Sequence, residues 1–418
     1  MALSSAVNPE DIKRKQRLSR GRAVGTSALR EDLVGWLFVL PAVVLVFVFG
    51  FFPIFFAGYM SLFDWRIRQG ASFCGRGLEE GASSIAFLTS CFGQYTIFIG
   101  DWGGAALFLF GFVLLFVAYR VWTRRFNRFD GSAEFWIRAA VTLAIIAVAF
   151  AIISQGYAQM FNALRPRDRG FLEGLQVTFF YAFGSIPVQI ALGLVLAYVL
   201  HQQLKGKQFF RMIFFLPYVT PTVAAAVVFG QIFSGRDTSL ANQFATFIGM
   251  DVQRWLSEPR PFLNVVFGLN LEGFLAGPSM ALVCVIILGW WTYTGYNAVI
   301  FLAGLGNIPR DLYEAARVDG ANDWHIFRFI TLPLLSPVTF YLTILGFIGT
   351  FTAFNTLFVM RTPASQGTLN TSALVIFDTF RSANRWGEAA AMSIVLLLIV
   401  LALTQVQRSV FEKRVFYG

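Results

Sequence analysis

The chain has few charged side chains, since Asp, Glu, Lys and Arg make up only 13% of its 418 residues. This share is about half of that in typical soluble domains. Hydrophobic residues make up 56% of the chain, and phenylalanine alone occurs 48 times. These proportions exclude an ordinary soluble fold and indicate a polytopic membrane protein. The net charge of +10 fits the excess of basic residues on the cytoplasmic side of membrane proteins, so it does not indicate a nucleic-acid partner.

The chain also lacks residues arranged for catalysis or metal binding. It has two histidines and three cysteines, no GxxxxGK[ST] phosphate loop and no nucleophile beside a base. No charged residue lies deep in an apolar run, although Glu173 and Arg211 lie near the ends of two runs. Carriers driven by protons or ions usually need such groups near the membrane midplane. We therefore expect a protein that is not an enzyme, has no catalytic, cofactor or metal site, and takes its energy from a partner.

Two of the cysteines, Cys74 and Cys91, fall in the first loop expected outside the membrane, whereas Cys284 falls in an apolar run. A disulfide between Cys74 and Cys91 is possible in an oxidising compartment. Two free thiols are the alternative, and the sequence does not decide between them.

Long apolar runs recur along the chain. Crossing a hydrocarbon core of about 30 Å takes about 20 helical residues, and about eight runs reach that length. They predict an all-α polytopic fold with transmembrane helices at 34–62, 104–122, 136–157, 171–200, 211–233, 279–304, 331–360 and 389–407. Most of the 33 Lys and Arg residues fall on the inner side if both termini are cytoplasmic, although Arg165, Arg167 and Arg169 fall outside. We predict that orientation.

The segment 310–337 has the mixed charge of soluble sequence and interrupts the apolar runs. Asp311 with Glu314 resembles a capping box, and Gly320 can end the resulting amphipathic helix in a left-handed conformation. Asn322 can cap a second short helix. The segment is therefore predicted to form a helix-turn-helix on the cytoplasmic surface of the membrane.

The residue order in this segment resembles the EAA loop of binding-protein-dependent ABC importer permeases. Glu314-Ala315-Ala316 is followed by Asp319-Gly320-Ala321, and then by Ile330, Leu332-Pro333 and Pro337. In that family the loop is a coupling helix that docks in a groove of a cytoplasmic ATPase. The resemblance implies that the ATPase-coupling residues are Leu312, Glu314, Ala315, Ala316, Asp319, Gly320, Ala321 and Trp324.

The resemblance covers about 33–65 and 171–418, and the first apolar run looks like that of the maltose importer's larger permease. It implies a basic cytoplasmic segment at 1–33, an anchor helix at 34–65, a six-helix-type importer core at 171–407 that contains the coupling loop, and a cytoplasmic tail at 408–418. Residues 66–165 are then an insertion, made of an external loop and a transmembrane hairpin. The simplest interpretation of this transmembrane hairpin is that it faces lipid and packs on the outside of the core.

Two apolar runs carry neutral polar and aromatic residues at helical spacing. The first holds Trp290, Trp291, Tyr293, Thr294, Gly295 and Asn297, and the second holds Phe351, Thr352 and Asn355. Amides suit the hydroxyl groups of a sugar, aromatic rings suit its apolar faces, and the resemblance places both runs where the maltose permease holds its sugar. We predict that these residues line a substrate path, with helix packing and interfacial anchoring as the alternative.

Further features concern bending and docking. Pro217 and Pro221 are expected to kink or unwind the run at 211–233, either at a gate or for packing alone. The outer loop 234–278 is a candidate face for an external binding protein, or else an ordinary loop. The outer segment after Met360 lacks the Gly-Gly-Pro that is usual in the family.

Taken together, the resemblance implies a permease subunit of a type I importer, multi-pass in the inner membrane, which moves a carbohydrate by alternating access. An oligosaccharide or a related polyol is the expected cargo. Its partners would be a second similar permease, two ABC ATPase subunits that use the ATP, and an extracytoplasmic sugar-binding protein. A heterodimer of permeases is favoured over a homodimer. A stand-alone carrier or channel for a neutral polar solute is the main alternative, and a membrane-bound enzyme is a third.

Overall fold

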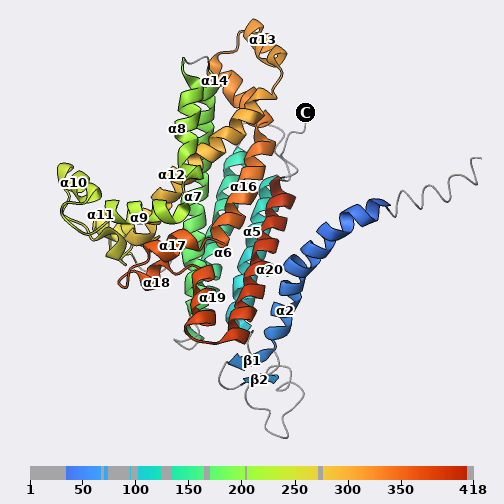
Figure 1. The fold of residues 1–418 in the computed structure, drawn as a ribbon. Coiled ribbons are helices and arrows are strands. Elements are labelled where there is room, and N and C mark those ends of the chain that lie inside the picture. The colour runs from blue at the N-terminus through green and yellow to red at the C-terminus, as the bar shows by residue number, and fades with distance from the viewer. Residues whose placement is uncertain are drawn as a thin grey trace, which may run out of the picture. The chain divides into compact units, whose positions relative to one another are not determined.

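The computed structural model describes residues 34–66, 70–73, 95, 102–123, 133–163, 170–202, 205–271 and 276–411 (Figure 1). The chain divides into two units, Met1–Tyr59 and Met60–Gly418. Cys74 and Cys91 lie outside the described residues, and so does the basic segment before residue 34.

The described part of the first unit is a long apolar helix. Val34–Met60 is long and apolar enough to cross a membrane, and it contains a π turn, η1 (Phe47–Phe51), followed by α2 (Phe52–Met60). Its side chains are exposed from Val34 to Phe56. A helix that is apolar on all sides is suited to lipid. It occupies the place of the first predicted span.

Helices dominate the second unit, as predicted for an all-α fold. The long helices and those that line the cavity described below are α5 (Trp102–Thr123), α6 (Ala133–Ala163), α7 (Gly170–His201), α8 (Lys207–Val219), α9 (Thr222–Ile232), α12 (Met280–Gly306), α16 (Ser336–Phe351), α17 (Asn355–Met360) and α20 (Trp386–Phe411). The shorter ones are α10 (Leu240–Phe247), η2 (Trp255–Ser257), α11 (Phe262–Phe267), α13 (Arg310–Val318), α14 (Asp323–Ile326), η4 (Phe327–Thr331), α15 (Leu332–Leu334), α18 (Gln366–Leu369) and α19 (Ser372–Arg381). Two short strands, β1 (Phe63–Arg66) and β2 (Gly70–Phe73), form an antiparallel hairpin that the sequence did not suggest.

The positions of the helices agree with the eight predicted spans, although at most seven meet the criterion of length and apolarity in the described part of the chain. In the described part of the chain, five helices are long and apolar enough to cross a membrane, and two bent helix pairs raise this to as many as seven. The apolar part of α5, Ala106–Val121, is shorter but stands at the second predicted span. Each predicted span therefore has a helix or a bent pair at its place.

Two spans are bent, one where the prolines predicted a kink and one where no bend was predicted. α8 and α9 meet at 92°, where Pro221 caps α9 with an extended backbone (ψ 123°), so the predicted proline kink is confirmed there. Pro217 lies inside α8 instead. The helical segments on either side of Leu335 meet at 59°. The predicted span 331–360 was also wrong in being continuous, because α16 ends at Phe351.

Glycines hold α5 and α6 close together. A Cβ at Gly156 would lie 2.5 Å from the backbone nitrogen of Phe108, and one at Gly111 would overlap Ile153. Small residues allow such close approach of membrane helices, where van der Waals packing replaces the hydrophobic effect. α5 and α6 therefore form a tightly packed pair.

The core of the second unit lies where α7 packs along α12. A Cβ at Gly193 would lie 2.6 Å from the Cβ of Asn297, so this glycine sets the spacing of the two helices.

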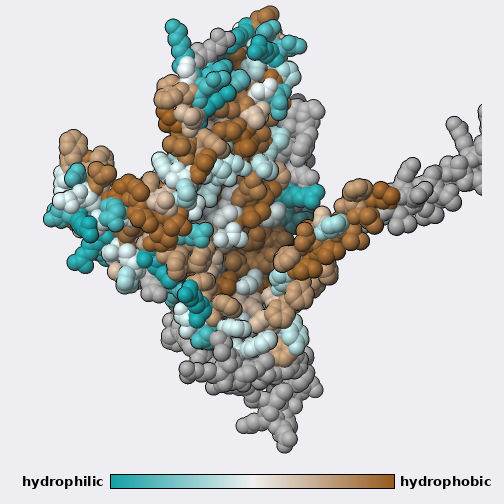
Figure 2. Space-filling model, in the orientation of Figure 1, coloured by the Kyte–Doolittle hydropathy of each residue, from teal (hydrophilic) through white to brown (hydrophobic). Residues whose placement is uncertain are grey.

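Figure 1 shows α13 and α14 at one end of this unit and α19 at the other, and Figure 2 shows hydrophilic residues gathered over α13.

The loop between α9 and α12 folds around one buried amide. The Asn242 Nδ2 group donates hydrogen bonds to the carbonyl oxygens of Arg236 (3.0 Å) and Gln253 (3.1 Å). Its Oδ1 accepts from the Gln253 backbone N–H (2.9 Å) and from the Trp255 indole (2.7 Å). Because every amide group is satisfied, this loop has a defined structure of its own.

The same loop holds an ion pair and is joined to the start of α12 by backbone hydrogen bonds. Arg260 donates to Glu258 through Nε (2.9 Å) and Nη2 (3.0 Å). These hydrogen bonds hold the pKa of the Glu258 carboxyl below its ordinary value, so the pair stays ionised in mild acid. The Met280 N–H donates to the Arg260 carbonyl at 3.0 Å, which links the loop to the first turn of α12.

Candidate functional site

The predicted coupling segment begins with α13, but its start differs from the prediction. Pro309 is the N-cap of α13, and no side chain caps the helix, so the capping box of Asp311 and Glu314 is wrong. Proline fixes the backbone angle needed at a helix start, which moves Asp311 inside the first turn. There the carboxylate still favours the positive end of the helix dipole. Glu314 is exposed and has no capping role.

The end of α13 agrees with the prediction for Gly320. This residue has φ +79°, in the left-handed region. Its N–H donates to the Arg317 carbonyl (3.1 Å), and the Ala321 N–H donates to the Ala316 carbonyl (2.9 Å). This pair of bonds is the Schellman motif, which satisfies the last carbonyl groups of a helix and reverses the chain.

A second short helix follows the turn, as predicted. The Asn322 side chain caps α14 by accepting the His325 N–H at 2.8 Å. Trp324 stacks on Phe327 with ring centroids 5.8 Å apart, and Phe327 meets Tyr198 of α7 at 5.1 Å. The chain then passes through the π turn η4 into α15. The helix-turn-helix is thus anchored on α7.

The predicted coupling residues form the outer surface of this helix-turn-helix. The exposed ones are Leu312, Glu314, Ala315, Asp319, Gly320 and Trp324, whereas Ala316 and Ala321 are half-buried. Trp324 is 62% exposed and Val318, which the sequence did not single out, is 88% exposed. Ile326, by contrast, is buried under the segment. Exposed apolar side chains on a polar loop are typical of a protein-binding surface.

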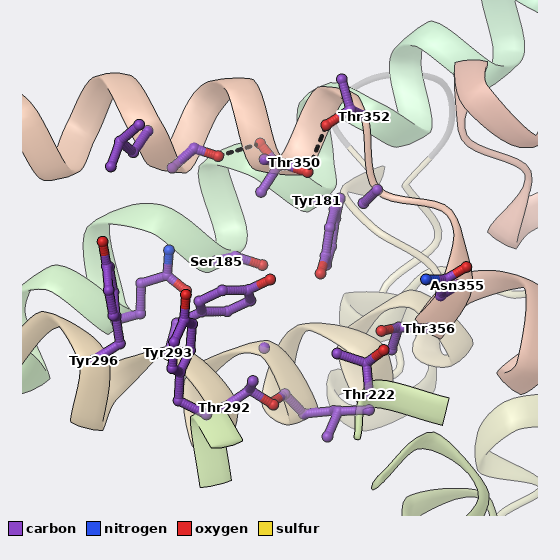
Figure 3. Close-up of a pocket in the computed structure, with 18 of the residues that line it drawn as sticks. Tyr181, Ser185, Thr222, Thr292, Tyr293, Tyr296, Thr350, Thr352, Asn355 and Thr356 are labelled. Carbon is purple, nitrogen blue, oxygen red and sulfur yellow. Dashed lines mark hydrogen bonds between the residues drawn. The ribbon is translucent and has the colours of Figure 1, made fainter. Parts of the chain in front are cut away.

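A cavity of about 360 Å³ lies between α7, α8, α9, α12, α16 and α17. Figure 3 draws most of the lining side chains around one space and labels ten of them. Its polar lining consists of Tyr181, Ser185, Gln189, Tyr218, Thr222, Thr292, Tyr293, Tyr296, Asn297, Thr350, Thr352, Asn355 and Thr356. None of the lining residues is charged.

Four of the residues predicted for the substrate path line this cavity: Tyr293, Asn297, Thr352 and Asn355. Thr352 and Asn355 reach the cavity because the helix is interrupted between α16 and α17. The Thr352 hydroxyl donates to the carbonyl oxygen of Ile348 (2.8 Å), a side-chain bond that competes with continuation of the helix. Asn355 then starts α17.

The other predicted residues do not line the cavity. The Trp290 indole donates to the Gly184 carbonyl (2.9 Å), and Trp291 packs on Phe229 with ring centroids 5.2 Å apart. Phe351 is fully buried, and its ring meets the edge of Phe179. Thr294 lies on α12 away from the cavity lining.

Gly295 does not line the cavity and instead sets the close approach of α8 to α12. A Cβ at this position would overlap the carbonyl oxygen of Phe214, so α8 crosses α12 in direct backbone contact there. The cavity-lining face of α12 is turned relative to the predicted sector. It consists of Leu288, Gly289, Thr292, Tyr293, Tyr296 and Asn297.

Residues on α7 were missed by the sequence reasoning. Tyr181, Ser185 and Gln189 all line the cavity. They lie four residues apart, which places them on one face of the helix. A polar stripe of this spacing within an apolar run was the signal that could have identified them.

Several cavity groups lack hydrogen-bond partners among the described residues. They are Ser185 Oγ, Gln189 Oε1 and Asn297 Nδ2, on side chains that are at least 95% buried. Leaving a buried donor or acceptor unpaired costs about 1–3 kcal/mol. These atoms, two on α7 and one on α12, offer both donors and acceptors to a neutral ligand.

Tyrosine rings form another wall of the cavity. Tyr218 of α8 stacks on Tyr296 of α12, with centroids 4.5 Å apart and ring planes 24° apart. Tyr218 also meets Tyr293 at 6.1 Å. Rings beside unpaired amide and hydroxyl groups can bind a molecule that has both apolar C–H faces and hydroxyl groups.

Comparisons with known proteins show which family this sequence matches. The family described as "Binding-protein-dependent transport system inner membrane component" matches residues 189–417. The arabinooligosaccharides transport system permease protein AraP of Bacillus subtilis (strain 168) is 34% identical over 236 residues, which are 56% of this chain and 69% of that protein. The lactose transport system permease protein LacF of Rhizobium radiobacter is 34% identical over 244 residues, 57% of this chain and 76% of that protein.

A solved structure supports the fold. It is that of a bacterial alginate ABC transporter in complex with an alginate pentasaccharide-bound periplasmic protein. One of its chains matches with a TM-score of 0.51 and 19% identity, over 68% of this chain and 97% of that one. At this identity the likeness concerns the fold alone.

Proposed function

Because this chain belongs to the inner membrane components of binding-protein-dependent transport systems, we propose that the cavity between α7, α12 and α16 carries a carbohydrate. The observation that supports this most is an uncharged cavity whose buried hydroxyl and amide groups lack partners among the described residues. A sugar supplies hydroxyl groups for those atoms and C–H faces for the tyrosines. Relatives named for arabinooligosaccharides and lactose agree with a saccharide cargo.

The chain is a permease subunit of an ABC importer, so the energy for transport has to reach it from elsewhere in the assembly. We infer that the exposed surface of α13 and α14 binds a cytoplasmic ATPase. Glu314, Val318 and Trp324 would supply the contacts, and Gly320 the turn between the helices. On this proposal the helix-turn-helix and both termini are cytoplasmic, and ATP is bound and hydrolysed in the ATPase subunits.

The complete assembly that we propose holds this chain, a second similar permease, two ATPase subunits and an external binding protein. Alternating access would come from rigid-body rocking of the permeases. The bend between α8 and α9 suits such a motion, because α8 carries Tyr218 and α9 carries Thr222 on the wall of the same cavity.

Gentle purification of the tagged full-length chain from its native membrane, followed by mass spectrometry, tests the assembly. We expect an ATPase and a second permease to co-purify. A chain that is recovered alone and moves solute into liposomes without ATP would support the stand-alone carrier instead. A chain recovered only with further copies of itself and an ATPase would favour the homodimer.

Replacing cavity amides tests the carbohydrate path. Asn297→Leu and Asn355→Leu should each lower the apparent affinity for the transported sugar roughly two- to tenfold, since each removes about one hydrogen bond. ATPase co-purification should not change. Uptake of radiolabelled sugars by membrane vesicles measures the effect. Thr343→Val is the matched control, because Thr343 bonds within α16 to the Thr339 carbonyl (2.7 Å) and does not line the cavity. Unchanged uptake in both asparagine variants would remove them from the path.

A further inference from the structure

Basic side chains gather where α7 ends and where α8 and α13 begin. His201 is the last residue of α7, Lys207 the first of α8 and Arg310 the first of α13, while Arg211 lies one turn into α8. The three cationic side chains lie close enough to His201 to act on it electrostatically. These four residues are called the basic cluster below. Figure 1 shows α8 and α13 reaching the same end of the second unit.

No carboxylate neutralises the basic cluster within the part of the chain that the structure describes. There, no Asp or Glu forms an ion pair within 4.0 Å of Lys207, Arg211 or Arg310. The charged groups that act on His201 are likewise all cationic. Three cations, two on α8 and one on α13, thus lie near His201 without an acidic partner among the described residues.

Arg211 has a buried donor group without a hydrogen-bond acceptor among the described residues. Its Nε is buried, and no described residue accepts a hydrogen bond from it. A guanidinium N–H withdrawn from water needs an acceptor, and phosphate oxygens match the fork of donors that arginine presents.

The surface next to the basic cluster is apolar and faces outward. Phe209 is 59% exposed, Phe210 43% and Met212 61%, and all three lie beside Lys207 and Arg211 on α8. Because α8 is the first half of a bent pair that is long and apolar enough to span a membrane, these side chains are suited to contact lipid tails. The basic cluster then lies at the level of the lipid headgroups, where each cation near an anionic surface adds to binding.

We propose that the basic cluster binds the phosphate group of an anionic phospholipid whose acyl chains lie along the exposed face of α8. Arg211 supplies the directed hydrogen bonds, and Lys207 and Arg310 add positive charge from two sides. The bound headgroup then bridges α8, which carries cavity residue Tyr218, and α13 of the helix-turn-helix. This role is separate from the transport of substrate.

Lipid binding to the purified full-length chain tests the proposal. Native mass spectrometry in detergent, with phosphatidylglycerol added at increasing concentration and phosphatidylcholine as the neutral probe, gives both affinities. We expect Lys207→Gln combined with Arg211→Gln to weaken phosphatidylglycerol binding at least tenfold and to leave phosphatidylcholine binding unchanged. The charge-preserving pair Lys207→Arg with Arg211→Lys should keep most of the preference, which separates charge loss from misfolding.

Arg236→Gln combined with Arg254→Gln is the matched control, because it removes the same charge from exposed residues of the loop between α9 and α12. Equal phosphatidylglycerol binding by this control and by the Lys207/Arg211 glutamine variant would overturn the proposal. So would a glutamine variant that keeps its lipid but loses the ATPase, since the basic cluster would then be a protein contact. Displacement of the lipid by millimolar inorganic phosphate alone would show an anion site without lipid specificity, and would also contradict it.

Discussion

Replacing Gly320 by valine should reduce ATP-driven uptake at least tenfold while the permease still inserts into the membrane. Gly320 has φ +79°, and its surroundings are open, since a Cβ added there would have no atom within 4 Å. The penalty therefore comes from the backbone itself, where a left-handed conformation costs a non-glycine residue about 1–2 kcal/mol. A β-branched residue is worse placed still.

The turn is short, so relief of this strain has to break the Schellman hydrogen bonds of Gly320 and Ala321. α14 would then point away from α13, and Trp324 would lose its place on the proposed ATPase surface. Uptake by vesicles and ATPase co-purification measure the two effects. Gly306→Val is the control, because Gly306 lies in open space at the end of α12 without a positive φ. Normal uptake by Gly320→Val would contradict a coupling role for this turn.

Gly295→Ala should destabilise the permease by about 1–3 kcal/mol, the usual cost of overpacking, and abolish most uptake. The added methyl group would overlap the Phe214 carbonyl oxygen and approach the Phe215 Cα to 3.2 Å. Both are backbone atoms that cannot rotate away, so α8 has to move off α12. The stacking of Tyr218 on Tyr296, which forms one wall of the cavity, would open with it.

Thermal unfolding in detergent, followed by size-exclusion chromatography, measures the loss of stability, and vesicle uptake measures the loss of function. Gly230→Ala on α9 is the matched change, because a Cβ added at Gly230 would meet nothing within 4 Å. There a methyl group should be neutral or slightly stabilising, since alanine favours helix more than glycine. A wild-type melting temperature for Gly295→Ala would show that α8 and α12 are less rigidly joined than their contact indicates.

The sequence predicted local features well and failed where distant helices decide the outcome. The turn at Gly320 and the cap at Asn322 depend on a few neighbouring residues, and both were correct. The capping box failed because Pro309 starts the helix before Asp311. For membrane spans, length and apolarity suffice to place the helices.

The cavity could be predicted only in part. Which face of α12 meets it depends on where α8 crosses, and that crossing is set by the contact of Gly295 with the backbone at Phe214. Aromatic residues such as Trp290 and Phe351 were predicted to line the substrate path, but in the structure both pack against neighbouring helices. The four-residue spacing of Tyr181, Ser185 and Gln189 marks one polar face of α7, but a polar face of this kind often serves to join helices, so only the structure shows that it lines the cavity.

The π turn η4 stands between the helix-turn-helix and the bend at Leu335. A π turn holds one residue more than an α turn, so it offsets the helical phase on its two sides. One residue corresponds to about 100° around a helix axis. η4 therefore turns the face that the chain presents after Thr331 relative to the face that α14 presents before Phe327, so the side chains of the helix-turn-helix and those of α15 are aligned differently than one unbroken α-helix would align them.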